Sequence, residues 1–236
     1  MTRIIAIHQP NFFPWLGYFD KIRRADIFIF LDDSQYQKTG GNWSNRVKLL
    51  INNEARWLTA PVERSFNGMR NINEMVFSSR EEWRSKTLKT LLFAYRGAPF
   101  FDETYSIIEP LVKNPQDNVA EYNIYAIKAL VSALGYSTNS LICSSDLPTS
   151  SFATERLVEL IRHVSGTGYL CGGGASNYQE DEIFERVGIK LTYQNFLHPT
   201  YSQFGNKEFF AGLSIVDALM NLGFNGVQQL LQNNGE

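Results

Sequence analysis

Apolar segments of the chain alternate between the spacing of strands and the spacing of helices. Near the start, apolar runs at 4–7 and 26–31 flank a short helical segment. Further along, strand-like and helical segments are expected in turn at 140–147, 152–166, 169–173, 177–188 and 189–196. This alternation is typical of strand–helix–strand crossovers. It predicts an α/β fold with a mainly parallel open sheet and flanking helices.

The middle of the chain follows another pattern. Asn52-Asn53 separates strand-like runs at 46–50 and 56–62, which predicts a β-hairpin. Helices are expected at 80–95, at 102–113 with a break near Pro110, at 118–134 closed by Gly135, and at 213–223 and 225–232. No repeat or linker divides the chain. We therefore expect one α/β domain over 1–236, with about 80–135 as a helical insertion or cap.

Composition narrows the class of protein. The net charge is −2 and no basic stripe is present, so a nucleic-acid partner is not expected. No apolar run reaches the length of a membrane span, and no secretory leader is evident, which favours the cytoplasm. Cys143 and Cys171 lack metal-type spacing, so no metal site is expected, and the sequence leaves any cofactor and the oligomeric state open.

Polar residues follow the first two expected strands. His8, Gln9 and Asn11 come after the first, and Asp32 and Asp33 after the second. Carboxyl ends of parallel strands form the ligand-binding edge of open α/β sheets. His8 is therefore a candidate acid/base or phosphate contact, and Asp33 a candidate for orienting a substrate hydroxyl or amine, with Asp32 beside it. The alternative is that the histidine braces the turn and the aspartates cap it.

The turn after the first expected strand is stiff and leads into a helix. Pro10 and Pro14 restrict its backbone, and Gly17 permits a close approach. Backbone N–H groups at a helix start attract phosphate, so this turn is a candidate phosphate seat. Trp15 adds an aromatic surface for substrate contact.

Further candidates for substrate binding are spread along the chain. Gln35 and Lys38 follow the second strand, and Arg46 and Lys48 are cations that suit a phosphate, although solvated surface charge explains them equally well. The loop Gly172-Gly173-Gly174 with nearby Tyr178 follows a strand and suits an anion, or else forms a simple tight turn.

A second His-Pro pair follows the last expected strand. His198 is a candidate second donor at the same sheet edge, with Tyr201 and Gln203 as substrate contacts; the alternative is a structural turn. Asp217 and Asn221 are four apart in an otherwise apolar helix, so they share one face. We expect them to form a buried hydrogen bond that braces this loop.

The ordered motifs IHQPNFFPWLGYFDKI, FLDDSQYQK, NRVKL, YLCGGGASNYQ, HPTYSQF and LSIVDALMNLG resemble the WbqC-like protein family over about residues 3–224. The resemblance implies a role in bacterial surface-polysaccharide (O-antigen, lipopolysaccharide) biosynthesis. More loosely, the opening is similar to nucleotidylyltransferase-like, Rossmann-like folds. Their paired histidine motif is not met here, because His8 has no second histidine near Gly17.

These features together favour an enzyme over a binding module. The hypothesis is a cytoplasmic transferase that moves an acyl, aminoacyl or nucleotidyl group to or from a nucleotide-activated (amino) sugar. His8, Asp33 and His198 are its candidate catalytic residues. The alternative is a non-catalytic accessory protein of the same pathway that binds a nucleotide-sugar or a partner.

Overall fold

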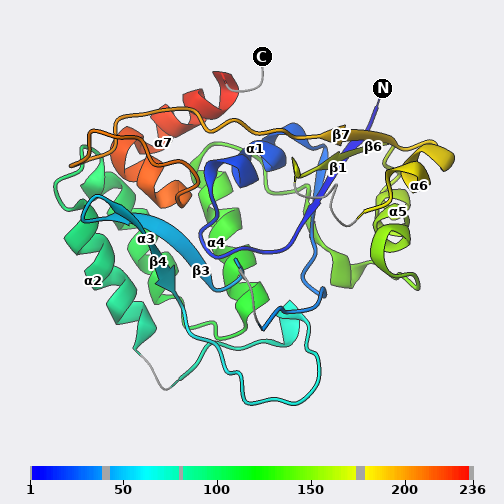
Figure 1. Ribbon diagram of the computed structural model, residues 1–236, viewed down its shortest axis with the longest axis horizontal. Helices are drawn as coiled ribbons and strands as arrows, with labels where there is room; N and C mark the ends of the chain where they lie inside the picture. Colours follow the sequence, from blue (N-terminus) through cyan, green and yellow to red (C-terminus); the bar gives the residue numbers. More distant parts are fainter. Residues whose placement is uncertain (1, 39–42, 80–81, 174–178, 234–236) are drawn as a thin grey trace.

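A parallel five-stranded sheet lies at the centre of the computed structural model, which describes all residues except 1, 39–42, 80–81, 174–178 and 234–236 (Figure 1). The strands run in the order β5-β2-β1-β6-β7. Their bounds are β1 (Ile4–His8), β2 (Ile27–Phe30), β5 (Leu141–Cys143), β6 (Gly168–Cys171) and β7 (Lys190–Tyr193). Counted within the sheet, this order is 3-2-1-4-5, which begins the strand order of dinucleotide-binding folds. The predicted parallel α/β fold is confirmed.

Each face of the sheet buries its own hydrophobic cluster, because side chains alternate along a strand. On β1, Ala6 belongs to a large cluster with residues of α1 to α4 and α7, whereas Ile5 and Ile7 belong to a smaller cluster with α5 and α6. Figure 1 shows α5 and α6 on one side of the sheet. The helices are α1 (Leu16–Arg24), α2 (Trp83–Tyr95), α3 (Phe101–Lys113), α4 (Val119–Ala133), α5 (Ala153–His163), α6 (Asp181–Arg186) and α7 (Ile215–Asn233).

The predicted hairpin is present as a separate two-stranded sheet of β3 (Arg46–Ile51) and β4 (Glu54–Thr59). Asn52 and Asn53 have φ angles of 51° and 60°, as a two-residue turn of type I′ requires. Asparagine tolerates this left-handed backbone better than most side chains. Two short 3₁₀ helices, η1 (Ile72–Glu74) and η2 (Ser144–Asp146), complete the elements.

The expected break in α3 near Pro110 is wrong. The helix continues to Lys113 with Pro110 in its last turn. A proline removes one hydrogen bond, here to the carbonyl of Ser106. Ser106 is exposed, so water can satisfy that carbonyl, and the helix reaches its end without a break.

The two helices expected at 213–223 and 225–232 form α7, with a kink between them. Gly223 has a φ of 66° inside the element, which is a left-handed backbone. A Cβ at this position would lie 2.6 Å from Cδ1 of Phe100. Glycine is therefore required here both by the backbone angle and by the close ring.

Candidate functional site

A pocket of about 830 Å³ opens at the carboxyl end of the sheet. It lies where β1 and β6 run side by side, although the chain leaves β1 toward β2 and reaches β6 only later. In open α/β sheets ligands bind at such a switch in strand order. We call it the switch-point pocket. The sequence candidates among its lining residues are His8, Gln9, Trp15, Gly17, Gly172, Gly173 and His198.

His8 ends β1, the central strand, and its ring is neutral. Nδ1 lies 3.1 Å from the carbonyl oxygen of Gln9. Because a carbonyl can only accept, we infer that Nδ1 carries the hydrogen and that Nε2 keeps its lone pair. Burial, and then the cation of Lys21, lower the pKa of His8 to about 3. The rings of Tyr18 and Trp15 pack edge-on to it, at centroid distances of 4.9 and 5.8 Å.

Lys21 is a charged residue of this pocket that the sequence analysis missed. It lines the pocket from α1, yet the residue is only 2% exposed. Its ammonium makes no hydrogen bond or ion pair with any described residue. Burial lowers the pKa of Lys21 to about 8, which leaves it mostly protonated at neutral pH. The available signal was its helical spacing, since Lys21 lies four residues after Gly17 and three after Tyr18.

The pocket carries positive charge without a balancing carboxylate. Two histidines and Lys21 line it, and none of its described lining residues is an aspartate or glutamate. Burial lowers the pKa of His198, so this histidine is also neutral near pH 7. Its ring packs edge-on against Phe196 at 5.1 Å. The electrostatics therefore favour an anionic ligand over a cationic one.

The loop after β7 is fastened to α1, and this contact forms one wall of the pocket. Gln194 Nε2 donates to the carbonyl of Gly17 at 2.6 Å and to Asp20 Oδ2 at 2.9 Å. A Cβ on Gly17 would lie 2.8 Å from Cδ1 of Phe196. The close approach therefore requires glycine at this position. Sequence analysis did not select Gln194 or Phe196.

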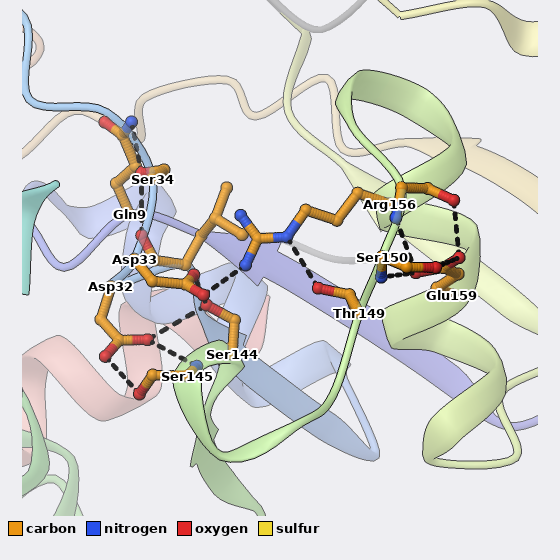
Figure 2. A network of polar contacts seen from close by, with 12 residues as sticks. Gln9, Asp32, Asp33, Ser34, Ser144, Ser145, Thr149, Ser150, Arg156 and Glu159 are labelled. Carbon is orange, nitrogen blue, oxygen red and sulfur yellow. Dashed lines mark hydrogen bonds and ion pairs between the residues drawn. The ribbon is translucent and has the colours of Figure 1, made fainter. Parts of the chain in front are cut away.

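Asp32 and Asp33 lie at the same sheet edge, outside the pocket lining, in the network of Figure 2. Asp32 accepts hydrogen bonds from Ser144 Oγ at 3.0 Å, Ser145 N at 3.1 Å and Ser145 Oγ at 2.7 Å. Asp33 pairs with Arg156 of α5 and accepts from Ser144. Burial raises the pKa of Asp33, but the hydrogen bonds from Arg156 and Ser144 lower it by more, below its usual range.

Gln9 connects this network to the pocket. Its Nε2 donates to Ser34 Oγ at 3.0 Å, and Ser34 Oγ donates to the carbonyl of Leu31 at 2.9 Å. Gln9 and Leu31 both line the pocket. These hydrogen bonds join the turn after β1 to the turn after β2. Asp32 and Asp33 belong to the second turn but lie outside the pocket lining.

Several other candidates lie away from the pocket lining. Asn11 is 2% exposed, and neither polar atom of its amide has a partner among the described residues. Gln35 forms an isolated antiparallel β-bridge with Asn71, and Lys38 Nζ donates a hydrogen bond to the carbonyl of Phe66 at 2.9 Å. Gly174 and Tyr178 lie outside the described residues.

Arg46 and Lys48 lie on the hairpin, where both cations stand over the ring of Trp57. Trp57 packs on Trp43 at 5.1 Å, and Trp43 packs on Trp15 at 5.3 Å. The hairpin cations are therefore joined to the pocket through a row of three tryptophans. Their role in substrate binding stays a prediction.

The predicted hydrogen bonds from Asp217 and Asn221 of α7 to the loop after His198 are confirmed. They engage the polar groups of Tyr201 and Gln203. Asp217 Oδ2 accepts from Tyr201 Oη at 2.7 Å and from Gln203 Nε2 at 3.1 Å. Asn221 Oδ1 accepts from the backbone N–H of Phe204 at 2.7 Å. Tyr95 Oη donates to Asp217 Oδ1 at 2.9 Å, and burial raises the pKa of this carboxyl despite its three donors. These bonds hold the loop that follows His198.

In the described part of the chain, no three His, Cys, Asp or Glu residues gather in a way that could hold a metal ion. Likewise, none of the helices formed by described residues has the length and apolar character needed to cross a membrane.

Comparison with known proteins places the chain in a family. The family model described as the WbqC-like protein family matches residues 9–229. An uncharacterized protein of Mycobacterium tuberculosis (strain ATCC 25618 / H37Rv) is 32% identical over 224 residues, which are 93% of this chain and 94% of that protein. No solved structure is significantly similar to the chain. The chain belongs to the WbqC-like protein family.

Proposed function

We propose that the switch-point pocket is the active site of a transferase acting on a nucleotide-activated sugar in the synthesis of bacterial surface polysaccharide. The observation that carries this proposal is the position of His8. It stands at the carboxyl end of the central strand, in a pocket with a cation and no described carboxylate. Its Nε2 makes no hydrogen bond to a described residue, so that nitrogen remains available to a substrate. The choice of surface-polysaccharide synthesis as the pathway is supported by what the resemblance to the WbqC-like protein family implies.

In this proposal His8 exchanges a proton with the acceptor. A hydroxyl or amine of one substrate attacks the activated group of the other, and Nε2 takes the proton that the nucleophile loses. The proton then passes to the leaving group, which restores the neutral ring. Burial is the main cause of the low pKa of His8 and the Lys21 cation is the second; an anionic substrate beside Lys21 counters this second cause and so acts to raise the pKa of the ring.

The other two candidates take different roles. His198 lines the pocket and serves as a second hydrogen-bond partner for the substrate. Asp33 holds the sheet edge, because its carboxylate is already engaged by Arg156 and Ser144. We propose Asp33 as a positioning residue that fixes the turn after β2.

The test begins with the identity of the substrate. A thermal-shift screen of nucleoside diphosphate sugars, nucleotides, acetyl-CoA and amino acids selects ligands, and turnover is then followed with pairs of these compounds. His8→Ala is expected to lower turnover by about 10²–10⁴. His163→Ala is the matched control, since His163 is an exposed histidine on α5. Folded His8→Ala protein with unchanged turnover would show that the site is elsewhere.

A second candidate is a nucleotide-sugar-binding accessory protein without catalysis. The burial of His8 favours it, because burial lowers the pKa of this histidine to about 3 and such a ring is a weak base near pH 7. Binding of a nucleotide-sugar, with no product from any co-substrate, would establish this alternative.

A further inference from the structure

Lys21 is a buried cation with no ion pair to a described carboxylate; the titratable group beside it is Cys171, whose own pKa burial raises, so the thiol is neutral near pH 7. Lys21 is 2% exposed, and no described donor, acceptor or carboxylate engages its ammonium. Buried lysines are rare unless they are paired, because water no longer stabilises the charge. The one acidic residue next to it, Asp20, is directed to Arg23, Arg24 and Gln194 instead. The charge therefore faces the switch-point pocket uncompensated.

We propose that Lys21, the first turn of α1 and the backbone at Gly172 form the subsite for a phosphate group of the substrate. This inference deepens the proposed function, on which it rests, by naming the charged part of the substrate. It concerns binding, so it can be tested without turnover.

The space around the ammonium suits an anion of this size. Lys21 and Gly172 both line the pocket of about 830 Å³, and a Cβ on Gly172 would lie 3.4 Å from Nζ of Lys21, so the backbone of Gly172 lies close beside the cation. Gly173 follows it in the lining. Glycines let a ligand approach the backbone, whose N–H groups bind phosphate oxygens well.

The start of α1 contributes a second source of positive potential. Gly17 borders the pocket in the first turn, and Lys21 lies four residues later on the same face. The first turn contains no acidic residue, and the N-cap, Trp15, makes no side-chain capping bond with a described residue. Helix N-termini attract anions through their free N–H groups and the helix dipole. The helix start and the lysine thus act on the same part of the pocket.

The test measures binding of simple phosphates to the full chain. Pyrophosphate, uridine monophosphate and glucose 1-phosphate are titrated by calorimetry at constant ionic strength, with uridine and glucose as uncharged counterparts. Lys21→Met removes the cation at nearly constant length. Lys190→Met is the matched control, because Lys190 is exposed at the opposite end of the sheet, at the start of β7. Circular dichroism confirms that each variant is folded.

We expect at least one phosphate to bind the wild type and Lys190→Met equally, and to bind Lys21→Met at least tenfold more weakly. Its uncharged counterpart should bind both proteins alike. As a second measurement, pyrophosphate should slow the acetylation of Lys21 by an amine-selective reagent, read by mass spectrometry.

The proposal is overturned if no phosphate binds the wild type at millimolar concentration, or if Lys21→Met binds phosphate as the wild type does. It is also overturned if a third experiment, reduction with borohydride, traps a carbonyl compound on Lys21. The last result would show a nucleophilic amine. Phosphate binding that fails while His8-dependent turnover persists refutes only this subsite. Phosphate binding that succeeds without turnover refutes only the transferase.

Discussion

Replacing Lys21 with methionine is expected to stabilise the fold while it removes the proposed phosphate subsite. The side chain is 2% exposed and its ammonium has no partner among the described residues, so the folded state carries an uncompensated charge. Methionine fills the same space with an apolar chain. Sites that bind charged ligands are often destabilised in this way, and activity is then exchanged for stability.

The magnitude follows from the pKa of the lysine. Burial lowers it from 10.5 to about 8. At 1.36 kcal/mol per unit, keeping the amine protonated costs the folded state about 3 kcal/mol at pH 7. For a chain of this length, a gain of that size corresponds to a rise in Tm of roughly 6–12 °C.

The sign of the pH dependence gives a sharper test. Between pH 8 and 10.5 the unfolded chain still holds the lysine proton that the folded chain has lost, so wild-type stability rises with pH relative to the variant. The advantage of Lys21→Met over the wild type should therefore fall from about 3 kcal/mol at pH 7 to about 1.5 kcal/mol at pH 9.5. Titrating groups that Lys21 does not influence are shared by the two proteins and cancel in the difference. His8 and Cys171 are coupled to Lys21, which acts to lower the pKa of both; His8 stays neutral between pH 7 and 9.5, so of these two only Cys171 adds to the difference.

The assay is urea unfolding of the wild type, Lys21→Met and Lys190→Met at both pH values. Equal m-values allow the free energies to be compared, and Lys190→Met should match the wild type within about 0.5 kcal/mol. The reasoning is refuted if Lys21→Met is less stable than the wild type at pH 7. It is also refuted if the difference between them is the same at pH 7 and pH 9.5.

Three other variants test the neighbouring contacts. Because the folded pKa of His8 is depressed to about 3, wild-type stability should fall as pH drops from 6.5 toward 3, and His8→Asn should lose less in acid unfolding curves. Gly17→Ala places a Cβ 2.8 Å from Phe196 and should cost about 1–3 kcal/mol in urea unfolding; an unchanged free energy of unfolding would contradict the close contact. Tyr201→Phe removes a donor to buried Asp217 and should cost about 1–3 kcal/mol; an unchanged midpoint would contradict the brace.

The sequence was sufficient to predict which residues end the strands, but not which strands are neighbours. His8 and His198 were expected at one sheet edge, and both line the pocket because the sheet is parallel. Asp32 and Asp33 follow β2, which pairs with β1 on the side away from β6. Contacts between segments far apart in the sequence decide on which side of β1 each strand pairs. The local spacing of apolar residues does not predict these contacts.

Lys21 shows a second reason why the site was only partly predicted. Within a short helix a lysine normally belongs to the solvent side, but here the helix lies against the loop after β7, which contacts Gly17 through Gln194 and Phe196, and Lys21 is buried in the same pocket wall. Tyr201 and Gln203 show the opposite error: both were predicted as substrate contacts, but their polar groups form hydrogen bonds to Asp217. The brace was predictable because both of its helical members lie four residues apart on one helix.

The position of β6 beside β1 has a consequence for synthesis on the ribosome. Strand β1 can pair with β2 soon after both emerge, but its other edge waits for β6, which begins roughly 160 residues after His8. At a typical synthesis rate of 5–20 residues per second, that central edge stays unpaired for about 8–30 s. Unpaired edges of apolar strands invite contact with other chains. Since β6 and the β7 loop complete the pocket, no ligand can shorten this interval, and nascent chains depend on helix cover or chaperones until the last third of the protein has emerged.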